Sequence, residues 1–218
     1  MSTHTKFITD EQRKYALKAV VSHVKRHDSL LITGAFGSGK TELLKQIRIN
    51  GAIRVRPLGG VYQILGEMCQ IADAKPRSKN KYLDLLCNHP RTLIIDEAQH
   101  LPEGLFPYLK IIMDGNGSNG GCSIIMAARE SLHESLRAKH ADVLSRMTVI
   151  PLDILSYEDM ATAMPDFADD SFLSIYHNMS NMREMMTAVK NCRDYAAEHS
   201  LTSINDDVIE NFVSGFGG

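Results

Sequence analysis

The sequence has few cysteines, and their spacing excludes two common uses of this residue. The four cysteines are Cys69, Cys87, Cys122 and Cys192, and no two of them form a CxxC pair. Scattered thiols argue against a zinc site and against a disulfide framework. Their pattern is typical of a protein that works in a reducing cytosol.

The sequence also lacks a large net charge and any long apolar run. With a formal net charge of only −2, a surface for nucleic acid would have to be a local patch. The polar N-terminal residues lack a signal-peptide apolar core, and no run approaches the length needed to cross a membrane. We therefore expect a cytoplasmic protein with no membrane partner. Hydrophobic residues still make up 44% of the chain, which is enough for a sizeable core.

Short apolar segments alternate with helical patterns along the first two thirds of the chain. The segments with strand character are 29–33 (SLLIT), 52–58 (AIRVRPL), 92–96 (TLIID), 122–127 (CSIIMA) and 147–152 (MTVIPL). Near-continuous apolar strands separated by helices predict an α/β fold with a five-stranded parallel sheet flanked by helices. After Pro151 the pattern is helical only. We predict an α/β domain over residues 1–153 and a small helical lid subdomain over residues 154–218.

Two helical segments carry more detailed expectations. Residues 10–26 predict a helix with Asp10 as its N-cap and an apolar stripe of tyrosine and valine. The members of this stripe are Tyr15, Val20, Val21 and Val24. Residues 74–81 form a polar, basic stretch that predicts a loop, and a short helix is expected over residues 82–88.

The strongest motif is a glycine-rich segment, Gly34-Ala-Phe-Gly-Ser-Gly39-Lys40-Thr41, which matches GxxxxGK[ST] in full. It lies between an apolar strand and a helix, which is the setting that a P-loop requires. Glycines let the backbone N–H groups curl around a phosphate, and the positive end of the following helix adds to that field. Lys40 would reach the β- and γ-phosphates of ATP, and the Thr41 hydroxyl would ligate Mg²⁺. The predicted nucleotide-binding residues of this segment are Gly34, Phe36, Gly37, Ser38, Gly39, Lys40, Thr41 and Glu42.

A second motif, LIIDE, is an apolar strand that ends in the carboxylates Asp96 and Glu97. Ligands of open α/β sheets bind at the carboxyl ends of the strands. Asp96 would hold the metal ion, and Glu97 would orient and polarise the water that attacks the γ-phosphate. The interval from the P-loop leaves room for an additional strand, which is typical of the P-loop NTPases that use a catalytic glutamate.

Two arginines complete the predicted site. Arg146 stands just before the fifth strand, where it can act in an oligomer as an arginine finger on the neighbour's γ-phosphate. Arg183 stands at the start of a helix in the predicted lid, where it could touch the γ-phosphate of its own subunit. Both side chains have the ordinary alternative of a solvated or salt-bridged surface arginine.

The order of these motifs resembles one group of AAA+ ATPases. The P-loop is followed by LIIDEAQHL, SIIMAARESL, VLSRMTVIPLDILSYEDM and NMREMMTAVKNC. This order is similar to that of the MuB, TnsC and TniB transposition regulators and their ExeA-like relatives, over about residues 10–195. The resemblance implies ATP hydrolysis, assembly into a ring or helical homo-oligomer on double-stranded DNA, recruitment of a transposase, and a bacterial or phage source. Where the group has a polar sensor after a small residue, this sequence has Arg129 after Ala128.

Clustered basic residues are the candidates for contact with DNA phosphates. The candidates are Arg54, Arg56, Lys75, Arg77, Lys79 and Lys81. The two at i, i+2 on the second predicted strand share one face, and the other four fall within seven residues of the basic stretch. Such clusters bind phosphates with little sequence preference, although lysines of this kind also occur on solvated loops. Two other functions stay open: an ExeA-like ATPase that remodels a protein partner, and an IstB- or DnaC-like helicase loader.

Overall fold

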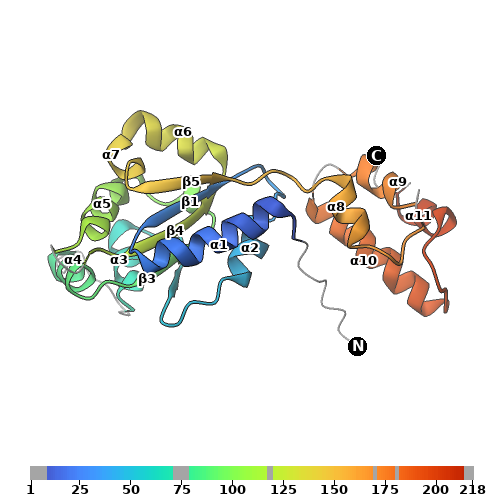
Figure 1. Cartoon of the computed structure of the whole chain (residues 1–218), viewed down its shortest axis with the longest axis horizontal. Coiled ribbons are helices and arrows are strands. Elements are labelled where there is room, and N and C mark those ends of the chain that lie inside the picture. The colour runs from blue at the N-terminus through green and yellow to red at the C-terminus, as the bar shows by residue number, and fades with distance from the viewer. Residues whose placement is uncertain (1–8, 71–78, 117–119, 169–170, 180–181, 214–218) are drawn as a thin grey trace. The chain divides into compact units, whose positions relative to one another are not determined.

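A computed structural model describes residues 9–70, 79–116, 120–168, 171–179 and 182–213 (Figure 1). The described chain divides into two compact units. The first unit contains Glu11–Ala35 and Lys40–Asp153, and it carries the whole sheet. The second contains the turn Phe36–Gly39 and the described residues from Ile154 on. Within the described residues, no helix has both the length and the apolar character that a membrane span requires.

The first unit is built on five strands. They are β1 (Ser29–Thr33), β2 (Ile53–Val55), β3 (Thr92–Ile95), β4 (Ser123–Ala128) and β5 (Met147–Pro151). The strands lie in the order β2-β3-β4-β1-β5, and every pair of neighbours is parallel. All residues of β1 and β4 are buried, because helices flank the sheet (Figure 1) and leave neither face of its centre to water. The predicted α/β fold with a five-stranded parallel sheet is therefore confirmed.

Helices and short turns connect the strands of the first unit. They are α1 (Glu11–Lys25), α2 (Lys40–Gln46), α3 (Val61–Met68), α4 (Lys79–Asn88), α5 (Phe106–Asp114), α6 (Glu130–Lys139) and α7 (Ala141–Leu144), with the 3₁₀ turns η2 (Ala98–His100) and η3 (Glu103–Leu105). Their packing follows helical spacing: Leu132 and Leu136, four residues apart on α6, are buried, while most of their neighbours are exposed.

The buried face of α1 agrees with the predicted stripe at Val20, which is fully buried, but differs from it elsewhere. Tyr15 is 61% exposed and Val21 is 51% exposed, whereas Ala16 and Ala19 are buried. The tyrosine and valine pattern left out the small alanines, which are buried where α1 packs against β1. The same face buries Arg13, whose Nη2 donates a hydrogen bond of 2.8 Å to the carbonyl oxygen of Asp153.

The second unit contains α8 (Tyr157–Thr162), α9 (Ser171–Asn178), α10 (Met182–Glu198) and α11 (Asp206–Val213). These helices share a core of their own, in which Phe172, Ile175 and Val189 are almost fully buried. An isolated parallel bridge between Phe167 and Ile204 is present in this unit, where only helices are predicted from the sequence. The side chain of Arg193 forms two hydrogen bonds with the carboxylate of Asp166, and this pairing lowers the pKa of Asp166.

Candidate nucleotide-binding site

The glycine-rich segment forms the turn between β1 and α2. Gly37 has a φ of 81° and Gly39 a φ of 83°, values that residues with a side chain rarely adopt. Glycine at these two positions therefore allows the turn to close directly before Lys40, the first residue of α2. Ser38, between the two glycines, is buried. The local conformation is the one that the P-loop prediction requires.

The ammonium group of Lys40 lies inside this turn. Its Nζ donates hydrogen bonds to the carbonyl oxygens of Gly34 at 2.8 Å and Ala35 at 2.7 Å, and the residue is only 9% exposed. Burial lowers the pKa of Lys40, and the charges of Glu97 and Asp96 act against that shift. The fold has thus brought the lysine of the P-loop into the electrostatic field of the two carboxylates that follow β3.

A sharp turn places those carboxylates where β3 ends. Glu97 has a φ of 52° and lies in the left-handed region, which is uncommon for a residue with a side chain. Its backbone N–H donates a hydrogen bond of 2.9 Å to Oδ1 of Asp96. The turn continues into η2, where Nε2 of Gln99 donates a hydrogen bond to Oε2 of Glu97. Backbone conformations of this kind are concentrated at functional sites.

The order of the strands brings Arg129 to the same end of the sheet as Lys40 and the two carboxylates. Strand β4 lies between β1 and β3, so its carboxyl end separates the glycine-rich turn from Asp96 and Glu97. Arg129 follows β4 directly and is the N-cap residue of α6. Its charge contributes to lowering the pKa of Lys40. Its backbone N–H donates a hydrogen bond of 3.3 Å to Oε1 of Gln99.

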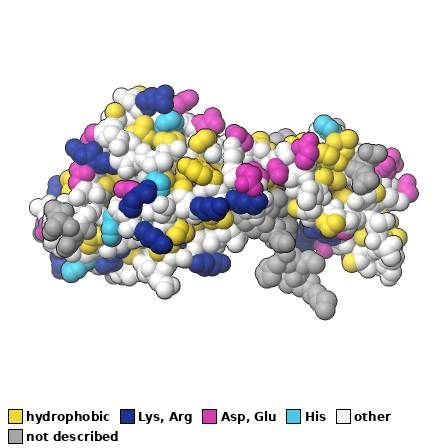
Figure 2. Space-filling model, in the orientation of Figure 1, with side chains coloured by type: hydrophobic (Ala, Val, Ile, Leu, Met, Phe, Trp, Pro, Cys, Tyr) yellow, Lys and Arg dark blue, Asp and Glu magenta, His cyan; other side chains and the backbone are white. Residues whose placement is uncertain are grey.

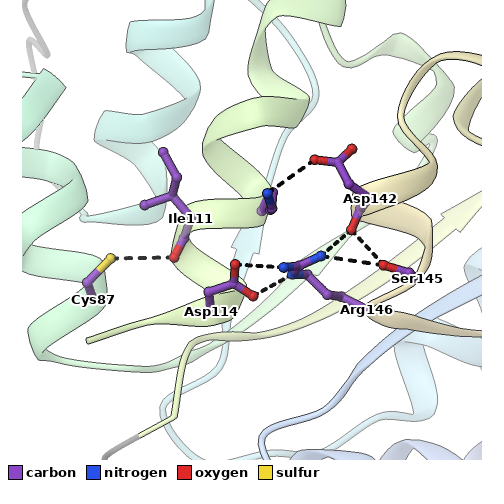
Figure 3. A network of polar contacts seen from close by, with 7 residues as sticks. Cys87, Ile111, Asp114, Asp142, Ser145 and Arg146 are labelled. Atoms are coloured by element: carbon purple, nitrogen blue, oxygen red, sulfur yellow. Dashed lines mark hydrogen bonds and ion pairs between the residues drawn. The ribbon is translucent and has the colours of Figure 1, made fainter. Parts of the chain in front are cut away.

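Arg146 lies in a polar network at the amino-terminal end of β5 (Figure 3), whereas the glycine-rich turn follows the carboxyl end of β1. Its Nε and Nη2 donate to the two carboxylate oxygens of Asp114 at the end of α5, the second bond being 2.9 Å long. Its Nη1 donates to the carbonyl oxygen of Asp142 and, at 3.4 Å, to the hydroxyl of Ser145. The hydrogen bonds to Asp114 raise the pKa of Arg146. Lys110 pairs with the carboxylate of Asp142 at 3.5 Å and extends the network.

The strand register shows how far Arg146 lies from the glycine-rich turn of its own chain. Met147 is opposite Ser29 at the start of β1, and Pro151 is opposite Thr33, the last residue before the glycine-rich turn. Arg146 precedes Met147, so roughly 16 Å of strand separates it from that turn. An arginine side chain does not extend so far. Arg146 therefore cannot reach a phosphate that is bound by the glycine-rich turn of its own chain.

Three further candidate residues are Thr41, Glu42 and Arg183. Thr41 and Glu42 are exposed in the first turn of α2, where Glu42 pairs with Lys45 at 2.7 Å. Arg183, on α10, has its guanidinium carbon 5.4 Å from the centre of the Phe36 ring, and both residues belong to the second unit.

The basic candidates for DNA contact are distributed over two elements. Arg54, in β2, donates hydrogen bonds of 2.8 and 3.5 Å to the carbonyl oxygens of Leu44 and Ile47 near the end of α2. Arg56 lies one residue beyond β2, is 80% exposed at its side chain, and pairs with Glu67 at 3.0 Å.

The other four basic candidates belong to the stretch that precedes residue 82. Lys79 and Lys81 belong to the first turn of α4, because this helix begins three residues earlier than the sequence predicts. Their neighbours Lys75 and Arg77 lie outside the described residues.

Gln99 and the partners of Arg146 were not predicted from the sequence. Gln99 follows Glu97 by two residues, and its amide is the kind of side chain that can hold a carboxylate, but only the turn at η2 brings the two together. The partner of Arg146 is 32 residues away on another helix, so no local pattern could indicate it.

The comparisons with known proteins agree with this geometry. Residues 23–136 match a family described as AAA domain. The fold is similar to that of the Aeropyrum pernix ORC2 protein, with a TM-score of 0.69 and 15% identity over 98% of this chain and 70% of that one. Domain III of the Thermotoga maritima replication initiation protein DnaA has a TM-score of 0.66 and 17% identity over 96% of this chain and 94% of that one.

A third similar structure is the Thermotoga maritima RuvB Holliday junction branch migration motor. It has a TM-score of 0.63 and 18% identity over 99% of this chain and 72% of that one. None of the curated proteins matches the sequence significantly. At these identities the structures establish a shared fold, while the family match covers more than half of the chain. The chain therefore belongs to the AAA domain family and is a nucleotide-binding AAA+ ATPase.

Proposed function

We propose that this AAA+ ATPase assembles on double-stranded DNA in its ATP-bound state and regulates transposition by recruiting or activating a transposase. The order of its motifs, from the P-loop to the helix that carries Arg183, resembles that of the MuB, TnsC and TniB group. The observation that carries the assembly part of the proposal is the position of Arg146. Because this arginine cannot reach the nucleotide of its own chain, a role as arginine finger requires a neighbouring subunit.

In this proposal the carboxyl edge of the sheet holds ATP and Mg²⁺. Lys40 contacts the β- and γ-phosphates, and the backbone N–H groups of the glycine-rich turn surround them. The hydroxyl of Thr41 and the carboxylate of Asp96 are hard oxygen donors, which Mg²⁺ prefers, and the phosphates and water would supply its other ligands. Two protein oxygen donors beside a phosphate-binding lysine fit a cation that is bound together with a nucleotide.

Hydrolysis in the proposed site depends on three further side chains. Glu97 orients and polarises the attacking water. Arg183, in the proposed lid over residues 154–218, reports the presence of the γ-phosphate. Arg146 of the adjacent subunit stabilises the charge that develops on the transferred phosphoryl group.

The proposed contact with DNA rests on local basic residues. On the face shown in Figure 2, Lys and Arg side chains are interspersed with acidic and apolar ones. Arg56 is the best candidate, because an exposed ion pair such as Arg56–Glu67 contributes only about 0–1 kcal/mol, so a phosphate can replace Glu67 at little cost. Lys79 and Lys81, with Arg54, Lys75 and Arg77, are proposed to extend the contact. Two of the similar structures are a replication initiation protein and a Holliday junction branch migration motor, which supports a function on DNA.

A gel-shift assay on duplex and single-stranded DNA, with ATP, with ADP and without nucleotide, tests this function. The proposal predicts retention of duplex DNA in ATP only. A preference for single-stranded DNA would instead indicate a helicase loader, and no DNA binding in any state would indicate an ATPase that acts on a protein partner.

A matched pair of variants locates the DNA surface. Arg56→Ala should weaken duplex binding and reduce the slope of log affinity against log salt by about 1, as for the loss of one phosphate contact. Arg137→Ala removes another exposed arginine, on α6, and should leave both quantities unchanged. Equal effects of the two variants would contradict the proposed surface.

A further inference from the structure

Gln99 connects the ends of two neighbouring strands of the sheet. It lies half-buried in η2, directly after the turn that follows β3. Its Nε2 donates a hydrogen bond to Oε2 of Glu97, and its Oε1 accepts one of 3.3 Å from the backbone N–H of Arg129 at the end of β4. One side chain therefore contacts both the carboxylate after β3 and the N-cap residue of α6.

The chemistry of the two partners fixes the orientation of this amide. An ionised carboxylate only accepts hydrogen bonds, and a backbone N–H only donates one. Reversing the amide would place its oxygen against the carboxylate of Glu97 and its NH₂ group against the N–H of Arg129, and both hydrogen bonds would be lost. The planar amide of glutamine donates through its NH₂ group and accepts through its oxygen, so it can satisfy both partners at once.

The contact selects one orientation for an otherwise exposed carboxylate. Glu97 is exposed, and its Oε1 has no hydrogen-bond partner among the residues that the structure describes. In the orientation that Gln99 holds, Glu97 opposes the lowering of the pKa of Lys40 more strongly than Asp96 does. The carboxylate thus interacts electrostatically with the phosphate-binding lysine, and its Oε1 can still accept a hydrogen bond.

We propose that Gln99 is a positioning residue for ATP hydrolysis, which holds the carboxylate of Glu97 in the orientation that receives the attacking water and couples it to the end of β4. This inference rests on the proposed role of Glu97. Because β4 lies between the P-loop strand and β3, a displacement of Arg129 on nucleotide binding would reach Glu97 through this amide. A misplacement of a reacting group by about 1 Å can cost roughly 100-fold in rate.

Two substitutions separate the hydrogen bonds of the amide. Gln99→Met has a similar volume and loses both, so kcat should fall about 10- to 100-fold while the ATP affinity and the melting temperature stay near those of the wild type. Gln99→Glu keeps an acceptor for the N–H of Arg129 but places a second carboxylate beside Glu97. It should therefore hydrolyse ATP no faster than Gln99→Met. If Gln99 served only to accept the hydrogen bond from Arg129, Gln99→Glu would keep the wild-type kcat.

The matched control is His100→Ala, in the same turn. The side chain of His100 is exposed and has no hydrogen-bond partner among the described residues, so this variant should keep the wild-type kcat. Rates are measured in single turnovers with labelled ATP, so that slow hydrolysis can be followed. In a Glu97→Gln background, Gln99→Met should have no further effect, because the carboxylate that it positions is gone.

The possible outcomes separate this inference from the function on which it rests. A wild-type or increased kcat in Gln99→Met, a Gln99→Glu variant as fast as the wild type, or an undiminished effect in the Glu97→Gln background would each overturn the inference. Wild-type turnover by Glu97→Gln alone would refute the proposed role of Glu97 itself.

Discussion

Replacing Arg146 by alanine should affect ATP hydrolysis far more than folding. The change removes the pair with Asp114, in which the side chains are 31% and 45% exposed. Breaking an ion pair this exposed costs about 1 kcal/mol, or about 2–4 °C in melting temperature for a chain of this size. Loss of an arginine finger costs about 10³- to 10⁵-fold in kcat. ATP binding to the isolated subunit should be unchanged, because Arg146 lies at the amino-terminal end of β5, whereas the glycine-rich turn follows the carboxyl end of β1.

The assay that assigns this effect to a neighbouring subunit mixes two inactive variants. Arg146→Ala subunits keep Glu97, and Glu97→Gln subunits keep Arg146. In a random equimolar assembly with head-to-tail interfaces, roughly one interface in four combines both intact residues, so turnover should recover to about a quarter of the wild-type value. Arg146→Lys should lose about as much activity as Arg146→Ala, because lysine lacks the planar guanidinium group that pairs with two oxygens.

Asp114→Ala provides the matched control. It removes the same ion pair but keeps the guanidinium, so it reproduces any effect on stability without removing the finger. The reasoning is refuted if Asp114→Ala is as inactive as Arg146→Ala, or if the mixture shows no recovery although the two kinds of subunit co-assemble. Either result would assign Arg146 to the network of Figure 3 alone.

Four other predictions address the rest of the chain. Lys40→Ala should abolish ATP binding in isothermal titration, because the phosphates lose their ammonium contact; unchanged affinity would place the nucleotide elsewhere. Glu97→Gln should bind ATP but hydrolyse it about 100-fold more slowly and accumulate ATP-bound assemblies, and full turnover would contradict its role. Burial raises the pKa of Cys192 to about 11, so a thiol reagent at pH 8 should label this residue only after unfolding. Asp166→Asn should lower the melting temperature of the second unit, because the hydrogen bonds with Arg193 lower the pKa of Asp166. That stabilisation is complete above the ordinary value of 3.8 and is lost as the pH falls through the lowered pKa, so melting curves of wild type and variant should converge in acid.

The parallel sheet was predictable because its strands are apolar on both faces. Segments such as SLLIT and SIIMAA form strands only where helices cover both faces of a sheet, and the structure places both at its centre. The order of the strands was not predictable from the same pattern. Nothing in the local sequence indicates that β4 lies between β1 and β3, which is the arrangement that places Arg129 between Lys40 and Glu97.

The candidate site was predictable where its residues are close in sequence. The glycines of the P-loop follow from backbone conformation, and their positive φ values agree with that reasoning. The partners of Arg146 and Gln99 depend on side chains that meet only after folding, and neither Asp114 nor Arg129 carries a local signal of its role. The stripe on α1 was right at Val20 but wrong at Tyr15 and Val21, because the helix buries the small residues Ala16 and Ala19 instead.

The central claim is that ATP is hydrolysed at a site that a neighbouring subunit completes on DNA. The most direct test measures ATP turnover per subunit as a function of protein concentration, with and without duplex DNA. We predict that turnover per subunit rises with concentration to a plateau, and that duplex DNA shifts this rise to lower concentration. A turnover per subunit that stays constant from dilute monomers to the assembled protein, and that duplex DNA does not change, would contradict the claim.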